Sequence, residues 1–519
     1  MTTIMLILVA AALGLGLSWL LHLPAIPLLV IAGVGLHVAG AVDDATLLQD
    51  VLMLGLAFLV FVLGTELSPR RVGAQARAAV GVGLAQFLVL GLVGLVCMRG
   101  LGFGWMTALY TGLALASSST LVVLNLLRQR QQFFEPFGRL VVGVLLLQDI
   151  LVIIAIAVLG RLDEGLAGVA WSVAGLGGLL AAAGVCIRWV GPAVLTRLED
   201  DDETLLIVVL AVLFLFVGAA HVMGLPVVAG AFLGGVALSG FPTHGIVRGQ
   251  LSSLADFFLA LFFVALGGVL TLPDSEQFAL LVLFVLVVLF VTPPLVALMA
   301  RRVGLTARSS IESGLLLAQC SEFSIIIALL GLDRGHLDSG LVSVIALTTV
   351  VTMILTPWTA TDAATWRIMR AGWRRRLPAP DTARRGHVLM LGSGTQGMRL
   401  LNALLAHGHE VVVVDDDAAV VAELQRRDVA AYRGDGADMD VLTKLGAADA
   451  RAIISNMRRV RDNLRMLAYV RQTNRDVPVL VRVFAPAEAA RIREHGGTAI
   501  VDSEAAADAF LNWFDRQQG

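Results

Sequence analysis

Long runs of apolar residues alternate with short polar segments over the first 366 positions of the chain. A transmembrane helix needs roughly 17 to 25 consecutive apolar residues. Thirteen runs approach that length, at about 4–21, 25–41, 50–66, 79–98, 105–127, 138–160, 168–190, 204–221, 223–240, 255–272, 277–300, 309–331 and 339–358. The pattern predicts a polytopic α-helical membrane domain over residues 1–366.

Composition agrees with this pattern. Hydrophobic residues make up 57% of the chain and charged residues 15%, and the mean hydropathy is +0.84. These values lie outside the range of soluble globular proteins. The net charge of −2 carries no information about partners because acids and bases nearly balance, and no nucleic-acid partner is expected. Cys97, Cys186 and Cys320 lack metal-ligand spacing and are interpreted as small core residues.

Basic residues are distributed unevenly among the polar segments. One set of loops holds Arg70, Arg71, Arg77, Arg128, Arg130, Arg139, Arg188, Arg197, Arg248, Arg301, Arg302, Arg308, Arg367, Arg370, Arg374, Arg375 and Arg376. The other set holds only Arg99, Arg161 and Arg334. By the positive-inside rule the N-terminus, which we expect to be uncleaved, lies outside, and everything after Arg367 is cytoplasmic.

Asp149 is a lone carboxylate in the run 138–160, eleven residues from either end. An ionisable group at the bilayer midplane costs roughly 2.5 to 3.5 kcal/mol, so it normally faces a bundle interior or a cavity and marks an ion or proton path. One carboxylate can hold a monovalent cation or a proton but not both, which is the minimal chemistry of an exchanger. The adjacent Gln148 offers a neutral oxygen ligand. The alternative is a structural carboxylate paired with a neighbouring helix.

Two segments of the chain resemble each other. LPAIPLLVIAGVGL begins at Leu23 and GLPVVAGAFLGGVAL begins at Gly224, seven runs apart, so the two copies cross the membrane in opposite directions. This arrangement predicts an inverted repeat, with a substrate site at the midplane between broken helices.

The repeat pairs the fifth run with the twelfth. The fifth carries Ser117, Ser118, Ser119 and Thr120, and the twelfth carries Gln319, Cys320, Ser321 and Glu322 at similar depth. Hydroxyls and freed carbonyls at an unwound point can replace the water shell of a cation. Such side chains can equally bond the preceding turn or join helices, and Glu322 can be either a coordinating or a structural acid.

Beyond Pro378 the composition changes abruptly. After a basic linker, 367–385, residues 386–519 are expected to form a Rossmann-like α/β domain. Strands are predicted at His387–Leu391, Glu410–Val414, Ala430–Tyr432, Ala452–Ser455 and Val477–Phe484, alternating with helices.

A glycine-rich turn follows the first of these strands. The motif GSGTQG comprises Gly392, Ser393, Gly394, Thr395, Gln396 and Gly397, and the second strand is followed by Asp415, Asp416 and Asp417. Glycines at this spacing suit a tight turn and the close approach of a pyrophosphate to a helix N-terminus, and Asp415 would take the ribose hydroxyls. The alternative is a Rossmann fold with a vestigial site.

The motifs together resemble the Kef-type branch of the second monovalent cation:proton antiporter family. The matching elements are LLLQDI around Asp149, ASSSTLVV at 116–123, GAFLGGVALS at 230–239, FFVALGG at 262–268, AQCSEFS at 318–324, GSGTQG at 392–397 and YRGDGAD at 432–438. The resemblance implies a homodimeric potassium/proton antiporter of the bacterial inner membrane, in which Asp149 exchanges the ions and the Gln148–Asp149 pair favours K⁺. It also implies a cytoplasmic domain that binds an adenine nucleotide (AMP, NAD or NADH) and gates transport. Asp435 would line the nucleotide pocket, and a soluble regulatory subunit is a further possible partner.

Two departures from the family pattern have consequences. The glutathione-gated members carry acids in the loop after the ninth run, whereas 238–255 contains no carboxylate here. Related electrogenic exchangers place a Lys in the twelfth run, whereas no Lys or Arg lies between Arg308 and Arg334. We therefore expect no glutathione regulation, and electroneutral exchange.

Three other functions remain as alternatives. A Na⁺/H⁺ antiporter would use the same oxygen ligands as a K⁺/H⁺ antiporter. A nucleotide-gated potassium channel would need a filter, and no TVGYG-like sequence is present. A membrane-anchored oxidoreductase would need an acid/base residue in a substrate domain, for which about 130 residues leave little room. The chain is therefore expected not to be an enzyme.

Overall fold

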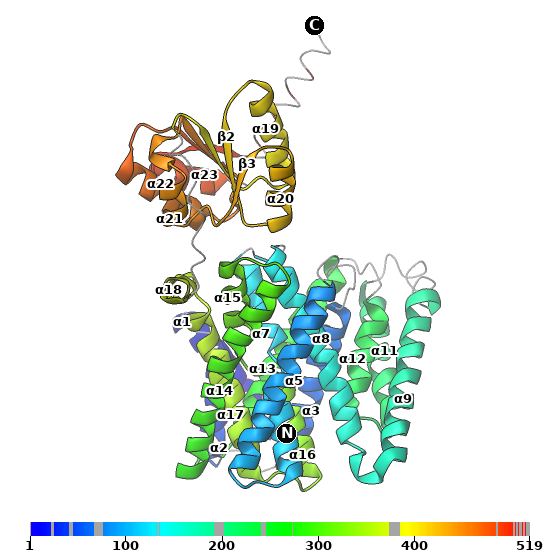
Figure 1. Ribbon diagram of the computed structural model, residues 1–519. Helices are drawn as coiled ribbons and strands as arrows, with labels where there is room; N and C mark the ends of the chain where they lie inside the picture. The colour runs from blue at the N-terminus through cyan, green and yellow to red at the C-terminus, as the bar shows by residue number, and fades with distance from the viewer. Residues whose placement is uncertain are drawn as a thin grey trace. The chain divides into compact units, whose positions relative to one another are not determined.

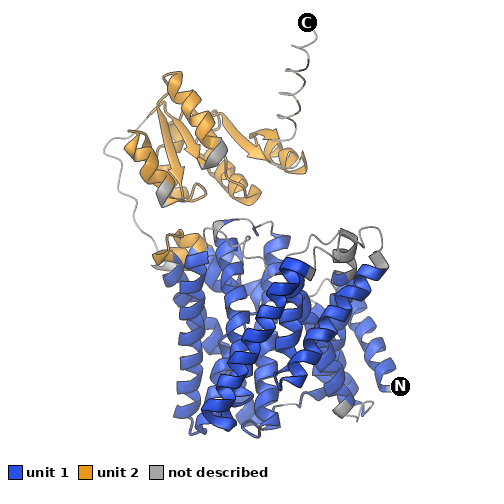
Figure 2. Ribbon diagram, turned by 90° about the vertical axis from the view of Figure 1, so that its right-hand side faces the viewer, with its two compact units in different colours: residues 1–300, 310–365 blue, residues 301–309, 366–519 orange. Residues whose placement is uncertain are grey.

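The computed structural model describes residues 2–21, 25–40, 45–66, 76–130, 132–133, 135–190, 202–239, 245–271, 273–372, 385–483 and 486–501, with four single positions beyond them. The chain forms two compact units, which Figure 2 distinguishes by colour. The membrane unit contains Met1–Ala300 and Ser310–Thr365, and the C-terminal unit contains Arg301–Ser309 and Trp366–Gly519. Leu23 and Pro24 of the predicted repeat, the basic residues Arg70, Arg71, Arg197 and Arg374–Arg376, and most of the predicted linker lie outside the described residues.

The membrane unit is helical throughout its described part (Figure 1). Its helices are α1 Thr2–Leu21, α2 Ala25–Val38, α3 Ala45–Glu66, α5 Ala76–Gly100, α6 Trp105–Leu115, α7 Thr120–Gln129, α8 Pro136–Leu159, α9 Gly165–Val185, α11 Asp202–Val222, α12 Val227–Leu238, α13 Gly245–Val269, α14 Ser275–Arg302, α15 Ala307–Leu316, α16 Glu322–Asp333 and α17 Ser339–Thr359. A 3₁₀ turn, Leu162–Glu164, precedes α9, and a π turn, Cys186–Val190, follows it. Each of the thirteen predicted runs corresponds to one or two of these helices.

By length and composition, nine helical segments among the described residues can cross a membrane, and α2, α12 and part of α13 are shorter apolar helices. The chain is therefore a polytopic membrane protein. The total of thirteen spans stays a prediction.

Two of the predicted runs are broken in the middle, as the inverted repeat requires. The fifth run divides into α6 and α7, and the twelfth divides into α15 and α16. Each second half starts on a serine cap: Ser119 Oγ accepts from the amide of Val122 at 3.4 Å, and Ser321 Oγ accepts from the amide of Phe323 at 3.2 Å. A serine that caps a helix competes with continuation of the preceding one, which explains why each break ends at a serine, Ser119 in the first and Ser321 in the second.

The inverted repeat is also seen in two helix crossings, each of which is formed by a pair of glycines. α2 packs against α13 where Gly33 meets Gly267, and α3 packs against α12 where Gly64 meets Gly235. A Cβ placed on Gly33 would lie 2.1 Å from the carbonyl oxygen of Val264, and one on Gly235 would lie 2.0 Å from that of Phe61. Gly33 and Gly235 stand ten residues after the equivalent leucines of the two sequence copies. The two crossings are therefore symmetry-related, and the predicted inverted repeat is confirmed.

The C-terminal unit contains a six-stranded sheet in the order β3-β2-β1-β4-β5-β6, with every neighbouring pair parallel. Its elements are α18 Asp362–Gly372, which begins in the membrane unit, β1 Val388–Leu391, α19 Gly394–Ala406, β2 Val411–Asp415, α20 Ala418–Arg426, β3 Ala430–Arg433, α21 Met439–Lys444, a 3₁₀ turn Ala447–Asp449, β4 Ala452–Ser455, α22 Val460–Thr473, β5 Val479–Val483, α23 Pro486–Glu494 and β6 Thr498–Val501. This order is that of a doubly wound dinucleotide-binding fold. Five strands were predicted to within about two residues, and β6 was missed.

The central strands are buried on both faces. Val388 and Met390 of β1 pack with α19 and α20, whereas Leu389 and Leu391 pack with α21 and α22. Such burial explains why VLML and VVVV are continuous apolar runs rather than alternating ones. The strand order reverses between β1 and β4, and ligands of this fold bind at the carboxyl ends of those strands.

Candidate functional site

Asp149 lies in the middle of α8 and is fully buried. Thr120, the first residue of α7, donates its hydroxyl to Asp149 Oδ2 at 2.9 Å. Asp149 Oδ1 has no hydrogen-bond partner among the described residues. Burying an unsatisfied carboxylate oxygen is costly. The position therefore suits a group whose second oxygen takes a proton or a cation.

The two broken helices meet beside this residue. Ser118 Oγ, in the first break, donates to the carbonyl oxygen of Leu317 in the second break at 2.7 Å. Ser324 in turn donates to the carbonyl oxygen of Ala114. Each broken helix therefore donates a hydroxyl to a backbone carbonyl of the other, so the two halves of the repeat are bonded to one another.

Gln148, next to Asp149 in the chain, connects α8 to the first break. Its Oε1 accepts from the amide of Ser118 at 3.0 Å, and its Nε2 has no partner within the described ranges. Gln86 of α5 also donates to Ser118 Oγ, at 2.9 Å. Gln86 was not among the predicted site residues, although it is the only strongly polar residue in the run 79–98, which is a signal that the sequence contains.

Glu322 is buried at the first turn of α16, within 3.4 Å of the Ser321 hydroxyl. The second break is also bonded to α17: Thr352 Oγ1 accepts from the amide of Cys320 at 3.0 Å, and Thr356 donates to Gln319 Oε1 at 3.2 Å. Ser117 is buried, and its hydroxyl lacks a partner in the part of the chain that the structure describes. Bonds thus join Ser118 to Gln148 and Thr120 to Asp149. Ser119 caps α7, and Glu322 is the first residue of α16.

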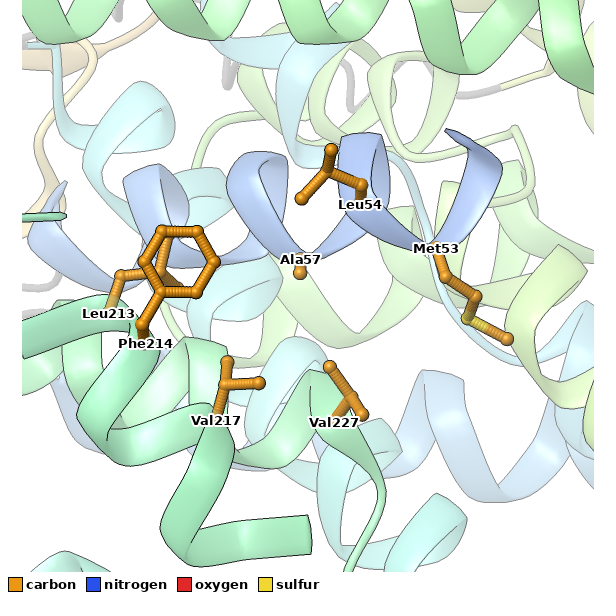
Figure 3. Close-up of a pocket in the computed structure, with 7 residues that line it drawn as sticks. All are labelled: Met53, Leu54, Ala57, Leu213, Phe214, Val217 and Val227. Carbon is orange, nitrogen blue, oxygen red and sulfur yellow. The ribbon is translucent and has the colours of Figure 1, made fainter. Parts of the chain in front are cut away.

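A cavity of about 180 Å³ opens elsewhere in the membrane unit, between α3, α11 and α12 (Figure 3). Its lining is apolar: Met53, Leu54, Ala57, Leu213, Phe214, Val217 and Val227. A cavity with no oxygen ligand cannot replace the hydration of a cation. It is therefore not the exchange site.

In the C-terminal unit, the glycine-rich turn begins where β1 ends, at the reversal of strand order. Gly392 has φ +79°, which favours glycine, and its carbonyl accepts from Asn456 Nδ2 at 2.9 Å. A Cβ on Gly397 would lie 2.9 Å from that Asn456 nitrogen. The backbone of Gly394, Thr395 and Gln396 is helical, and the side chains of Thr395 and Gln396 lie outside the described part of the structure. Gly392 and Gly397 therefore have the structural roles predicted for a dinucleotide-binding turn.

Asp415 closes this turn from the end of β2. Its Oδ2 accepts from both the amide and the hydroxyl of Ser393 at 2.7 Å, and its Oδ1 accepts from the amide of Asp417 at 3.0 Å. Asp415 is 7% exposed, whereas Asp416 is exposed. The predicted ribose acid thus already positions the glycine-rich turn. A carboxylate has about four lone-pair sites, so a ribose hydroxyl can still bind.

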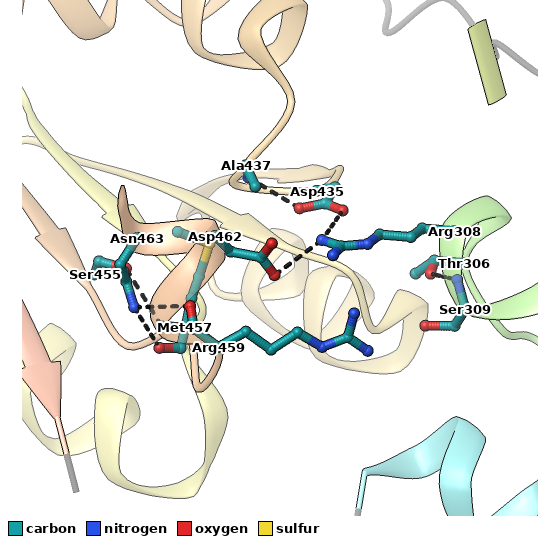
Figure 4. A network of polar contacts seen from close by, with 10 residues as sticks. All are labelled: Thr306, Arg308, Ser309, Asp435, Ala437, Ser455, Met457, Arg459, Asp462 and Asn463. Atoms are coloured by element: carbon teal, nitrogen blue, oxygen red, sulfur yellow. Dashed lines mark hydrogen bonds and ion pairs between the residues drawn. The ribbon is translucent and has the colours of Figure 1, made fainter. Parts of the chain in front are cut away.

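Asp435 follows β3 at the same edge of the sheet and accepts from two donors. Its Oδ1 accepts from the amide of Ala437 at 2.9 Å, and its Oδ2 accepts from Arg308 Nη1 at 3.2 Å. Arg308 also donates to Asp462 Oδ2 at 2.9 Å (Figure 4). Arg308 was predicted only as a basic loop residue, and its contact with Asp435 was not predicted, because 127 residues separate the two in the chain.

Comparison with known proteins identifies the family of each part of the chain. Residues 4–363 match the family model for the transmembrane sodium/hydrogen exchanger, and residues 388–503 match that of the TrkA-N domain. A putative K(+) efflux antiporter KefB of Alkalimonas amylolytica is 26% identical over 503 residues, which cover 92% of this chain and 76% of the relative. The predicted Kef-type resemblance is confirmed by these matches.

Solved structures resemble each unit separately. The sodium proton antiporter MjNhaP1 of Methanocaldococcus jannaschii has a TM-score of 0.57 at 14% identity and covers 72% of this chain and 100% of its own, which shows the fold alone. The TrkA-N domain of the inner membrane protein ybaL of Escherichia coli is 25% identical and covers 25% of this chain and 98% of its own, with a TM-score of 0.25. Because the exchanger family model matches residues 4–363, more than half of the chain, the chain belongs to the transmembrane sodium/hydrogen exchanger family, as a cation/proton antiporter with a C-terminal TrkA-N nucleotide-binding domain.

Proposed function

We propose that this chain exchanges K⁺ for H⁺ across the bacterial inner membrane, one for one, at Asp149, and that nucleotide binding to the C-terminal domain gates the exchange. The observation that carries the proposal is the buried Asp149 Oδ1, which has no partner among the described residues and lies beside two helix breaks. A site with one open carboxylate oxygen accepts a proton or a dehydrated cation in turn.

The neighbouring oxygens complete the proposed cation site. Gln148 Oε1, the hydroxyls of Ser117 and Thr120, and carbonyls freed at Ala116–Ser119 are neutral ligands of the kind that alkali cations take. Glu322 at the opposite break is proposed as a second acid. No Lys or Arg lies between Arg308 and Arg334, so no fixed cation there compensates the charge of a bound ion. Loss of one proton for each K⁺ bound is then the simplest electroneutral cycle.

The nucleotide is proposed to be NAD, NADH or AMP, with its phosphates at the N-terminus of α19 and its ribose at Asp415. The active form is proposed to be a homodimer, with its N-terminus outside and its C-terminal domain in the cytoplasm. The KefB relative is named as a K⁺ efflux antiporter, which supports K⁺, whereas MjNhaP1 is a sodium proton antiporter. Na⁺/H⁺ exchange is therefore the second candidate.

Proton flux in proteoliposomes tests the proposal. A pH gradient is imposed, K⁺ or Na⁺ is added separately, and the full chain is compared with Asp149→Asn. Asp50→Asn is the matched control, because Asp50 is an exposed acid of α3. We expect K⁺ to dissipate the pH gradient in the wild type and in Asp50→Asn but not in Asp149→Asn. An imposed membrane potential should not change the rate of this dissipation.

Other results of this experiment would show which part of the proposal is wrong. Na⁺-dependent flux that is lost in Asp149→Asn would keep the exchange site and overturn the K⁺ assignment. Equal flux in the wild type and Asp149→Asn would remove Asp149 as the exchange site. A dependence on membrane potential would contradict electroneutrality.

A further inference from the structure

The segment Arg301–Ser309 connects two helices of the membrane unit but packs within the C-terminal unit. We call this segment the docking loop. α14 ends in it at Arg302, and α15 begins in it at Ala307, with a turn at Gly304 where φ is +97°. The chain therefore passes between the two units after residues 300, 309 and 365.

The docking loop both accepts and donates hydrogen bonds at the end of β3. Arg433, the last residue of β3, donates to the carbonyl oxygens of Gly304 at 3.1 Å and Leu305 at 3.4 Å. Arg308 of the loop donates to the carboxylates of Asp435 at 3.2 Å and Asp462 at 2.9 Å. These side-chain hydrogen bonds fix the position of the docking loop, which a solvated surface contact would not do.

The arginine and its partners are largely removed from water. The side chain of Arg308 is 7% exposed, that of Asp462 is 9% exposed and that of Asp435 is 21% exposed. The Arg308 guanidinium also lies 5.2 Å from the ring centre of Trp366, which Arg465 approaches from 4.6 Å. A buried charge persists only where opposite charges and hydrogen bonds compensate its lost hydration. Removing a single carboxylate should therefore weaken the hold on Arg308 strongly.

Asp435 connects this network to the proposed nucleotide pocket. Both of its carboxylate oxygens already accept bonds, one from Arg308 and one from the amide of Ala437. A nucleotide that engages Asp435 must share the carboxylate with Arg308 or displace it. Asp462, in the first turn of α22, would still accept a bond from Arg308.

Arg308 connects the same network to the ion site through a single helix. It is the second residue of α15, which runs without interruption to Leu316. The next residue, Leu317, accepts the bond from Ser118 in the other broken helix, and Glu322 follows at the start of α16. An α-helix is stiff over this length, so a shift of its first turn moves its last turn.

We propose that Arg308 is the positioning residue that transmits nucleotide occupancy at Asp435 to α15, and so to the crossing of the two broken helices. This inference rests on the proposed nucleotide-gated exchange. A nucleotide at Asp435 weakens the bond to Arg308, and the docking loop then holds the start of α15 less firmly. Because coupling between two sites is reciprocal, the bond to Arg308 also opposes nucleotide binding.

The test measures binding and transport separately on the full-length protein. NADH and AMP are titrated individually onto purified protein, and exchange in proteoliposomes is recorded with and without each. The variants are Arg308→Gln, Arg308→Lys and Asp462→Asn. Arg302→Gln is the matched control, because Arg302 is an exposed arginine of the same loop.

In the wild type and Arg302→Gln, we expect nucleotide to change the exchange rate by about fivefold or more. Arg308→Gln and Asp462→Asn should bind nucleotide as tightly as the wild type or more tightly, yet exchange at the same rate with and without it. Arg308→Lys should keep part of the response, because an ammonium retains the charge but not the planar fork. A purely structural defect would instead lower binding and exchange together. If Arg308→Gln does not fold, Asp462→Asn carries the test alone.

Several results would overturn the inference. One is an undiminished nucleotide response in Arg308→Gln or Asp462→Asn. Another is loss of binding in Arg308→Gln but not in Asp462→Asn, which would make Arg308 a nucleotide ligand. If the wild type binds nucleotide but its exchange does not respond, gating and the role of Arg308 both fail while exchange at Asp149 stands. If the wild type binds none, the nucleotide site itself is wrong.

Discussion

Thr120 donates a hydrogen bond of 2.9 Å to the carboxylate of Asp149, from the first residue after the break between α6 and α7. The bond occupies Oδ2 and leaves Oδ1 without a partner among the described residues. One oxygen is thereby fixed while the other stays available. The break in one helix thus orients the acid carried by another.

Replacing Thr120 with valine should raise the cation concentration at half-maximal exchange by about tenfold, because a buried hydrogen bond to a charged group contributes about 1.5 to 3 kcal/mol. Flux in proteoliposomes at several K⁺ concentrations measures this. Thr111→Val is the control, since Thr111 is a buried threonine of α6 that donates to the carbonyl oxygen of Thr107. Equal behaviour of the two variants would contradict a role for the Thr120 hydroxyl at the acid.

The glycine crossings should be intolerant of a single methyl group. Gly267→Ala would place Cβ 2.2 Å from the carbonyl oxygen of Val30 and 2.9 Å from the Cα of Gly33. Overpacking of this kind costs about 1 to 3 kcal/mol, so the thermal midpoint in detergent should fall. Gly35→Ala should leave the midpoint unchanged or raise it, because no atom lies within 4 Å of a Cβ there. A midpoint for Gly267→Ala as high as that of Gly35→Ala would show that the helices separate easily at this crossing.

Asp415→Asn should weaken nucleotide binding by about tenfold or more. Both oxygens of a carboxylate accept hydrogen bonds, whereas an amide side chain has only one accepting oxygen. That single oxygen cannot serve the Ser393 amide, the Ser393 hydroxyl and a ribose hydroxyl together. Calorimetric titration of the purified protein with NADH measures the change. Glu423→Gln provides the comparison, since Glu423 is a partly exposed acid of the following helix α20. Unchanged affinity in Asp415→Asn would assign the ribose to another acid, of which the exposed Asp416 is the nearest in the chain.

The stability of the C-terminal domain should depend on pH through Asp462. The pKa of Asp462 is raised from 3.8 to about 6: burial is the largest cause, the charge of Arg308 opposes it, and the charge of Asp435 adds to the rise. Because the folded pKa exceeds the ordinary value, the folded state binds more protons between pH 4 and 6. The group's contribution is therefore favourable at low pH and is lost as the pH rises through about 6.

A pKa shift of this size changes the free energy of unfolding by at most about 3 kcal/mol. Denaturation of the full chain should show a less steep loss of stability between pH 4 and 7 in Asp462→Asn than in the wild type, monitored by a signal from the C-terminal domain. Protonation of Asp462 also removes one carboxylate charge from beside Arg308, so the nucleotide response of exchange should weaken below about pH 6. An identical pH profile in the two proteins would show that Asp462 titrates normally.

The sequence by itself determined the class of protein, the thirteen helical runs, the inverted repeat and most of the Rossmann-like sheet. These features follow from local patterns, because apolar runs of a given length form membrane helices and continuous apolar strands between glycine turns form a parallel sheet. Asp149, Gln148 and the serine-rich break stood out because polar groups are costly at the midplane. The weak strand β6, with only two buried residues, had no such signal.

Only the tertiary structure decided which distant groups meet. Gln86, Thr352 and Thr356 join the crossing of the broken helices, and Arg308 pairs with Asp435 and Asp462. These partners lie 32 to 154 residues away in the chain. Which of them meet depends on how elements pack, and no local propensity encodes it. The docking loop is an example. In the sequence its arginines are typical positive-inside residues, whereas in the folded protein one of them, Arg308, pairs with two acids, Asp435 and Asp462.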